Sequence, residues 1–453
     1  MRILQVNTSN LGGGAESVAT RLLHGYRGAG HKSWLAVGKI TERAEEGIYR
    51  IPSGYGVWGA GLGALSDRAR RLTANARGAG RLHRILDHVS RPPSILDWRR
   101  GREDFNFPGT SKLLDLTTER PDIVHAHNLH GKYFDLRMLP QLSAAVPFIL
   151  NPHDAWLLSG HCAHSFDCER WKTGCGECPD LNIHQPVRKD SSAQNWAVKK
   201  QIFSRSRLYV STASQWLMDK VEKSMLQGGV VEAKVIPYGV EMDIFRPGDK
   251  ASLRRELDIP EDAVTMLFVA RGLRTNRWKD YPTLEKALQL AAARAEGRRI
   301  VFLGLGDRAP SRKMGNVEVR FVPFENEKSK VARYYQAADV YLHPAKVDTA
   351  PQTVMEAMAC GVPIIASAVA GIPEQVKSLT DGEYGPGEAT GFLVPRGDSE
   401  AMARAIVDLS SDDDLRQRLG RNAHDDAAAR FDVRGYVSAF AGWFEDILEL
   451  RRR

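Results

Sequence analysis

Two carboxylates, Asp348 and Glu356, flank the start of a short helical pattern within the stretch from Val347 to Ala366. Pro351 suits the first position of such a helix and Gly361 its C-terminal cap. The first turn of a helix offers N–H groups without internal partners to an anion. Those N–H groups belong to Gln352, Thr353 and Val354. Ionised carboxylates accept hydrogen bonds from paired hydroxyls, so the pair suits two polyol rings on either side of a diphosphate, which is the layout of a nucleotide-sugar.

A glycine-rich loop follows the first apolar run of the chain. Residues 10–16 read Asn-Leu-Gly-Gly-Gly-Ala-Glu and open a helical pattern. Because they lack side chains, Gly13 and Gly14 let backbone N–H groups approach a phosphate, although the same glycines could form a simple tight turn. The spacing is not G-x-G-x-x-G and no acidic residue ends the next apolar run, so a nicotinamide cofactor is disfavoured.

Histidines end two of the predicted strands. His153 directly follows a strand pattern and precedes Asp154. Ligands collect at strand ends in open α/β sheets, so we expect His153 at the site, although a lone histidine is more often structural. His125 and His127 end the preceding strand and are weaker candidates for contact with an acceptor.

Apolar runs alternate with helical patterns of about 10–15 residues, which predicts βαβ units and parallel sheets. The alternation starts again near Val264. A chain of 453 residues also exceeds what one core usually organises, so the fold class is α/β with two doubly wound, Rossmann-like domains. We predict the first at 1–236 and the second at 237–430. An amphipathic helix at 431–453 is expected to cross back to the first domain.

The segment 347–366 resembles the acid-x7-acid signature of the retaining glycosyltransferases of family 4. Other landmarks of that family occur in the expected order, and they are residues 12–14, 235–240, 245–247, 268–272, 302–306 and 391–395. The resemblance spans nearly the whole chain. It implies the GT-B fold, in which an acceptor-side domain and a nucleotide-sugar donor domain face a central cleft. It also implies retention of anomeric configuration, by front-face attack assisted by the leaving phosphate, without a catalytic metal.

The resemblance implies a role for each matching residue. Arg271 and Lys279 hold the donor diphosphate, where their cations offset charge developing on the leaving nucleotide. Glu356 binds the ribose hydroxyls, and Asp348 and His153 contact the transferred sugar; these three are the catalytic candidates. The family more often has Glu where this chain has Asp348. The side chain of Asp348 is one methylene shorter than that of Glu. This departure leaves open which sugar is transferred and, to a smaller degree, whether the chain is active.

Four of the five cysteines fall within 17 residues of the loop 161–179, and they are Cys162, Cys168, Cys175 and Cys178. Their C-x5-C-x6-C-x2-C spacing ends in a good zinc half-site, but the first pair is wider than usual. A structural zinc held by all four is the first hypothesis, with reduced thiols in a packed loop and disulfides as alternatives. A similar loop occurs in a subset of these transferases associated with surface polysaccharides. Cys360 stands alone in an apolar pattern and is expected in the core.

The positive charge is concentrated. Of the net +8, +6 lies in residues 66–103, which hold ten Arg and no Lys against four acidic residues. With the apolar run before it, the insertion 57–103 predicts an interfacial element on an anionic membrane, or alternatively a solvated basic face. The charge lies away from the proposed diphosphate segment, so we expect no nucleic-acid partner. No apolar stretch approaches about 20 residues and Met1–Asn7 lacks a secretory signal, so we expect the cytoplasmic face of the membrane.

Together these features predict a retaining glycosyltransferase that moves a sugar from a nucleoside-diphosphate-sugar to a glycan. The expected acceptor is a lipid-linked oligosaccharide of exopolysaccharide or lipopolysaccharide synthesis. The composition, 43% apolar and 26% charged, excludes a fibrous or disordered chain. The alternatives are a nucleotide-sugar epimerase or glycogen-type synthase on the same fold, and a sugar-nucleotide-binding protein without turnover. We expect no cofactor in catalysis, and zinc only as a structural ion.

Overall fold

The computed structural model describes residues 1–453 apart from 42–44, 53–91, 296, 381 and 453. The described chain divides into two compact units. Unit 1 comprises Met1–Thr212, Leu217–Val235 and Phe440–Arg453, and unit 2 comprises Ala213–Trp216 and Ile236–Ala439. Each unit contains one predominantly parallel sheet with helices, so the predicted α/β class is confirmed.

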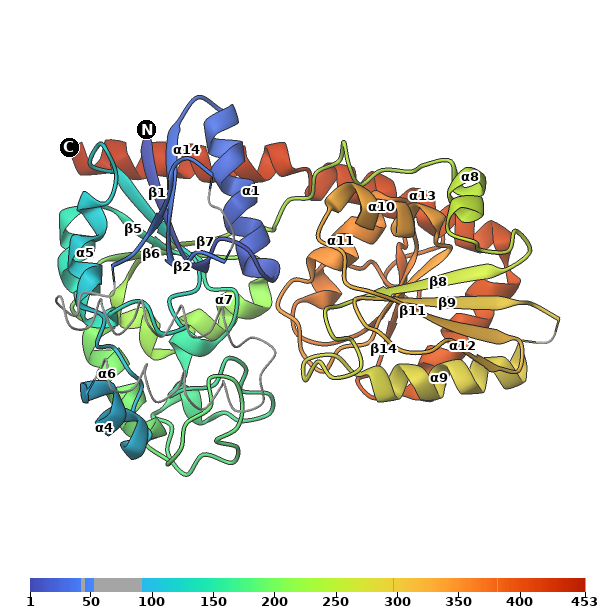
Figure 1. The fold of residues 1–453 in the computed structure, drawn as a ribbon, viewed down its shortest axis with the longest axis horizontal. Helices are drawn as coiled ribbons and strands as arrows, with labels where there is room; N and C mark the ends of the chain where they lie inside the picture. Colours follow the sequence, from blue (N-terminus) through green and yellow to red (C-terminus); the bar gives the residue numbers. More distant parts are fainter. Residues whose placement is uncertain (42–44, 53–91, 296, 381, 453) are drawn as a thin grey trace, which may run out of the picture. The chain divides into compact units, whose positions relative to one another are not determined.

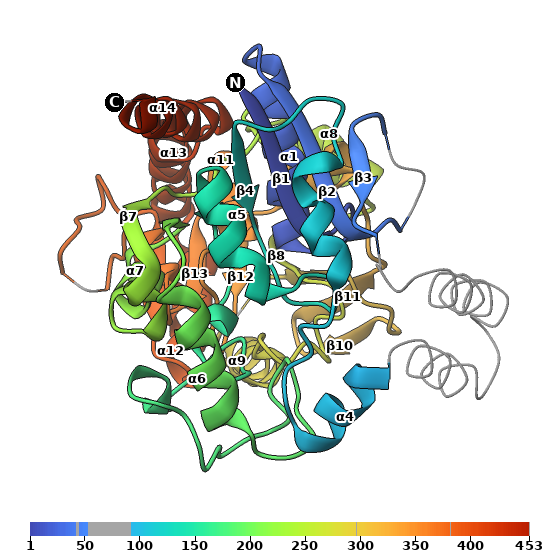
Figure 2. The same cartoon turned by 90° about the vertical axis from the view of Figure 1, so that its left-hand side faces the viewer.

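Unit 1 is built on a sheet with the strand order β3-β2-β1-β4-β5-β6-β7, in which the described pairs are parallel. Its strands are β1 (Arg2–Ser9), β2 (Lys32–Lys39), β3 (Ile48–Arg50), β4 (Ile123–Ala126), β5 (Phe148–Leu150), β6 (Leu208–Thr212) and β7 (Val230–Val235). Its helices include α1 (Gly14–Gly28), α4 (Pro92–Arg100), α5 (Leu139–Ala145), α6 (Ser192–Phe203) and most of α7 (Gln215–Glu222). The strand order reverses direction at β1, so α1 lies on one face and α5 and α6 on the other (Figures 1 and 2).

Unit 2 has the strand order β10-β11-β9-β8-β12-β13-β14, parallel except for the antiparallel β10–β11 pair at one edge. Its strands are β8 (Val264–Val269), β9 (Ile300–Leu305), β10 (Arg312–Met314), β11 (Val317–Val322), β12 (Val340–His343), β13 (Ile364–Ser367) and β14 (Gly391–Val394). Its helices are α8 (Lys250–Glu256), α9 (Tyr281–Arg294), α10 (Lys328–Ala337), α11 (Gln352–Ala359), α12 (Ser399–Ser411) and α13 (Asp413–Arg430). Helices α9 and α12 pack together, and α11 packs against α13 (Figure 1).

Local sequence explains these elements. Strands β9 and β12 are buried along their whole length, as expected for parallel strands covered on both faces, and therefore read as continuous apolar runs. Helices α12 and α13 are capped at their N-termini by Asp398 and Asp412, whose carboxylates accept the N–H groups of Ala401 and Leu415. Among the described helices, none combines the length and the apolar character needed to cross a membrane.

The last helix, α14 (Val433–Arg452), passes from unit 2 into unit 1 between Ala439 and Phe440. The rings of Phe440 and Phe444 lie 4.6 and 5.4 Å from the ring of His125, centre to centre. The indole Nε1 of Trp443 donates to Glu232 Oε1 at 2.9 Å. The second half of α14 therefore supplies part of the core of unit 1.

Candidate functional site

The donor-side candidates of unit 2 gather where its strand order reverses. Strand β8 continues to β9 on one side, while the chain returns to β12 on the other. Such a switch point leaves a crevice at the carboxyl ends of the strands, where ligands of doubly wound sheets bind. The loops that follow β8 and β12 are joined there, since Lys279 and Ala345 form an antiparallel bridge and Asp280 N–H donates to Pro344 O at 3.1 Å.

This junction places Lys279 against Asp348, 69 residues away in sequence. The ammonium Nζ lies 2.6 Å from Asp348 Oδ2 and 3.0 Å from Nε2 of His343, the last residue of β12. Burial alone would raise the pKa of Asp348, but the charge of Lys279 and its hydrogen bond to the carboxylate hold it well below its usual value. Burial, with Lys279 next to it, lowers the pKa of His343 to about 4. At neutral pH the site therefore contains a cation, a carboxylate and a neutral imidazole.

The second carboxylate lies on α11. Glu356 is half-buried, and its Oε2 accepts the hydroxyl of Tyr335 at 2.9 Å. The prediction that Pro351 is the first helical residue is wrong, because Pro351 has extended backbone angles and caps a helix that starts at Gln352. Its carbonyl accepts the N–H of Val354 at 3.2 Å, so that amide is engaged within the first turn rather than turned to an anion.

Arg271 lies in the loop after β8 and is exposed, with its guanidinium carbon 5.2 Å from the ring centre of Phe324. The neighbouring loop after β9 approaches the same backbone at Gly306, which has φ +114°. A Cβ there would lie 2.2 Å from Ala270 O, so only glycine fits. This close approach fixes the backbone that carries Arg271.

In unit 1 the glycine loop is hydrogen-bonded by a side chain of the helix that follows it. The N–H of Gly13 donates to Glu16 Oε2 at 2.9 Å, and Gly13 caps α1. The Gly13 N–H that was predicted to face a phosphate thus donates to a carboxylate. The donor-binding roles of Gly13 and Gly14 stay predictions.

The three histidines of unit 1 differ in exposure. His153 is half-buried, its Nε2 lies 3.1 Å from His127 Nδ1, and burial lowers its pKa to about 4. His127 and His125 are fully buried, with His127 Nε2 facing Gln5 Oε1 at 2.9 Å and His125 Nδ1 facing Tyr26 at 3.2 Å. Neither buried ring is presented to an acceptor, so only His153 keeps its place as a candidate.

The loop 161–179 carries the four clustered cysteines. All four of its cysteines are free thiols. Cys175 Sγ accepts the N–H of Gly160 at 3.3 Å, and Cys178 Sγ lies 3.2 Å from His161 Nε2. Burial raises the pKa of Cys175 to about 11. Across the described ranges, no three His, Cys, Asp or Glu side chains are arranged to hold one ion, and the structural zinc stays a prediction. Cys360 is buried, as expected.

Sequence reasoning missed His343, Tyr341 and Tyr335. Their contacts with the predicted residues join strand β12 and helix α10 to segments distant in sequence. One signal was available, because His343 is a polar residue at the carboxyl end of a buried strand. The basic stretch from 57 to 91 lies outside the described residues.

Residues 249–426 match the family described as Glycosyl transferases group 1. The chain is 28% identical over 262 residues to the putative colanic acid biosynthesis glycosyl transferase WcaC of Escherichia coli K12, covering 55% of this chain and 60% of that protein. It is 32% identical over 204 residues to the D-inositol 3-phosphate glycosyltransferase of Actinosynnema mirum, covering 42% and 46%. The chain thus spans about half the length of these curated relatives.

Solved structures match over the whole chain. The sucrose-phosphate synthase of Thermosynechococcus elongatus has a TM-score of 0.63 at 18% identity and covers 99% of both chains. HepE of Anabaena, in complex with UDP and glucose, has a TM-score of 0.60 at 18% identity, covering 98% of this chain and 100% of its own. The predicted GT-B fold is confirmed.

Proposed function

We propose that this chain, whose residues 249–426 match the group 1 glycosyl transferases, is a retaining glycosyltransferase that moves a sugar from a nucleoside-diphosphate-sugar to a glycan. The observation that carries the proposal is Lys279, held by Asp348 and His343 at the switch point of the second sheet. Glu356 lies on helix α11, which begins shortly after the loop that carries Asp348. This arrangement offers positive charge for a diphosphate and carboxylates for hydroxyls.

Each group has one task in the proposed reaction. Lys279 and Arg271 bind the diphosphate, Glu356 accepts hydrogen bonds from the ribose, and Asp348 and His153 contact the transferred sugar. The bond between the anomeric carbon and the diphosphate breaks, and a bond to the acceptor oxygen forms on the same face of the sugar. The acceptor proton passes to the departing phosphate oxygen. No side chain changes its covalent state, and the proposed reaction uses no catalytic metal.

The relatives favour a polysaccharide pathway. WcaC is named for colanic acid biosynthesis and HepE was solved with UDP and glucose. We propose a uridine-type donor as the first to test and a lipid-linked oligosaccharide of exopolysaccharide or lipopolysaccharide synthesis as acceptor.

The exposed residues of α4 support the proposal that the acceptor is bound to a membrane. Leu96 and Trp98 are 49% and 45% exposed on this helix, next to the exposed Arg99 and Arg100. Apolar and aromatic side chains beside cations are the features of an interfacial helix on anionic lipid. We therefore propose peripheral binding at the cytoplasmic face, with residues 66–103 as the contact.

The direct test is a screen of sugar nucleotides against membrane lipid extract, with glycolipid products detected by mass spectrometry. Glu356→Ala should abolish most transfer, while Glu261→Ala, an equal loss of charge at an exposed residue of the same unit, should not. Transfer near the wild-type rate in Glu356→Ala would reject the role of Glu356. Release of free nucleoside diphosphate only when acceptor is added distinguishes transfer from epimerisation. Donor binding without any product would support a non-catalytic binding protein, the alternative favoured by Asp348 in place of Glu.

The membrane contact is tested separately by flotation with phosphatidylglycerol vesicles. Replacing Arg99 and Arg100 by Gln, and in a second variant the arginines of 66–91, should reduce the bound fraction. Unchanged binding in both variants would reject this segment as the anchor.

A further inference from the structure

Two of the three N–H groups of the Lys279 ammonium are already engaged. They point at Asp348 Oδ2 (2.6 Å) and at His343 Nε2 (3.0 Å). An ammonium has three donors and no lone pair. The side chain is 12% exposed, and within the described ranges no other residue accepts from its Nζ. One N–H therefore remains for a ligand, and the other two contacts fix its direction.

The contact with His343 defines the state of that imidazole. A neutral imidazole carries one N–H and one lone pair, and burial keeps His343 neutral by lowering its pKa to about 4. Lys279 can only donate, so Nε2 must be the acceptor and the proton must sit on Nδ1. Asp348 Oδ2 lies farther from Nε2, at 3.4 Å. Nδ1 lies 3.3 Å from the hydroxyl of Tyr341, which can accept this N–H.

The chain of contacts continues to the helix start. Tyr341 is fully buried on β12, and its hydroxyl is hydrogen-bonded by the side chain of Thr353, at the start of α11. His343 thus lies between Lys279, on the loop after β8, and the first turn of α11. Its ring is 0% exposed, so it is buried beneath the site rather than presented to a ligand.

We propose that His343 is a positioning residue that holds Lys279 by accepting one of its N–H groups, so that the free N–H is aimed at the diphosphate of the donor. The inference rests on the proposed function, because it requires a phosphate ligand at Lys279. The competing interpretation is a core histidine that only fills space on β12. The two differ in one respect: a positioning residue acts only when Lys279 is present.

The test is a double-mutant cycle on UDP binding, measured by titration calorimetry with the full chain. We expect Lys279→Met to weaken UDP binding by tenfold or more. His343→Leu should weaken it by about tenfold, the effect of losing one hydrogen bond to a charged group. In the Lys279→Met background, His343→Leu should cause no further loss. His343→Gln, whose amide oxygen can reach the position of Nε2, should restore most of the affinity.

Equal losses from His343→Leu in both backgrounds, or no loss in either, would overturn the positioning role. Thermal unfolding of each variant shows whether the fold is retained. Should His343→Leu fail to fold, His343→Asn takes its place, because its amide reaches the Nδ1 position but not that of Nε2. If wild-type protein binds neither UDP nor ADP, GDP or CDP, the proposed function itself fails. That outcome is distinct from one in which wild-type protein binds UDP and replacing His343 leaves the affinity unchanged.

Discussion

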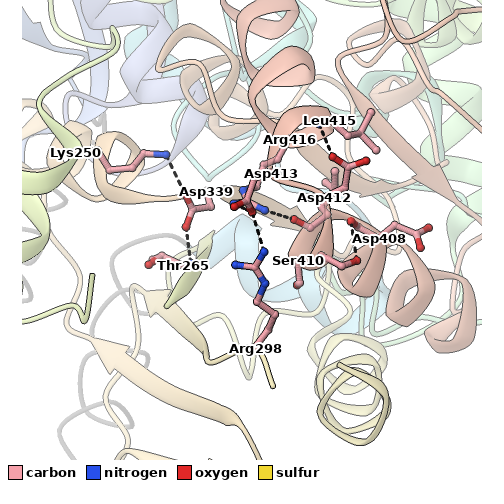
Figure 3. A network of polar contacts seen from close by, with 12 residues as sticks. Lys250, Thr265, Arg298, Asp339, Asp408, Ser410, Asp412, Asp413, Leu415 and Arg416 are labelled. Atoms are coloured by element: carbon pink, nitrogen blue, oxygen red, sulfur yellow. Dashed lines mark hydrogen bonds and ion pairs between the residues drawn. The ribbon is translucent and has the colours of Figure 1, made fainter. Parts of the chain in front are cut away.

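The opposite end of β12 offers a sharp test of how unit 2 is held together. Asp339 immediately precedes the strand and accepts hydrogen bonds from the guanidinium of Arg254, from Lys250 Nζ at 3.0 Å and from Thr265 N–H at 2.8 Å. Figure 3 shows Lys250 and Thr265 converging on its carboxylate. Both Asp339 and Arg254 are 9% exposed at their side chains. Asp339 thereby ties helix α8 to strands β8 and β12.

Replacing Asp339 by Asn leaves Arg254 buried without a counter-charge. Removing one partner of a buried ion pair costs about 3–5 kcal/mol. The Lys250 contact adds at most about 0.5 kcal/mol, because that side chain is 45% exposed. The Asn oxygen can still accept from Thr265, so that hydrogen bond is retained. We therefore expect Asp339→Asn to lower the free energy of unfolding of unit 2 by about 3–5 kcal/mol.

The matched control is Glu261→Gln, which removes an ion pair at the surface. Arg255 is 63% exposed and Glu261 is 70% exposed, so this substitution should change the free energy of unfolding by less than about 0.5 kcal/mol. The assay is urea unfolding of the full chain, with hydrogen exchange of the α8 and β12 peptides assigning the transition to unit 2. UDP affinity should stay unchanged, because Asp339 and His343 lie at opposite ends of β12. A loss below about 1 kcal/mol in Asp339→Asn would refute the assignment of a buried, uncompensated Arg254.

Three further predictions concern the site and the cysteine loop. Tyr335→Phe removes the hydroxyl that holds Glu356 Oε2, so the donor KM should rise several-fold with little change in kcat; a loss confined to kcat would contradict ribose binding by Glu356. The folded-state pKa values of His153 and His343, about 4, lie below the unfolded value of about 6.5, so the unfolded chain binds more protons between these limits. Stability should therefore fall by a few kcal/mol as pH drops from about 6.5 to 4, and a constant melting temperature across that window would disprove the shift. Elemental analysis of protein purified without added zinc tests the four cysteines, and less than about a tenth of an equivalent would defeat the zinc hypothesis.

The fold could be predicted further than the site. The alternation of apolar runs was predicted to restart near Val264, and strand β8 begins at that residue, because the apolar run that forms it is local. The partners of the predicted site residues could not be predicted from the sequence. His343 contacts Lys279, 64 residues away, only because the loops after β8 and β12 pair in the fold. The engagement of Gly13 by Glu16 was local, yet glycine spacing alone does not show which acceptor a free N–H will find. Spacing likewise placed the thiols in one loop without fixing where each points.

Helix α14 has a consequence for the order in which the protein is made. Phe440 and Phe444, which pack against the ring of His125, leave the ribosome only after unit 2 up to Ala439 has been made. Chains usually complete their domains from the N-terminal end during synthesis. Here all of unit 2 up to Ala439 has been synthesised before unit 1 receives the side chains that close its core. Of the two units, the one whose sheet is translated first is thus completed second, and a nascent chain stalled before Phe440 would hold a complete unit 2 and an unfinished unit 1.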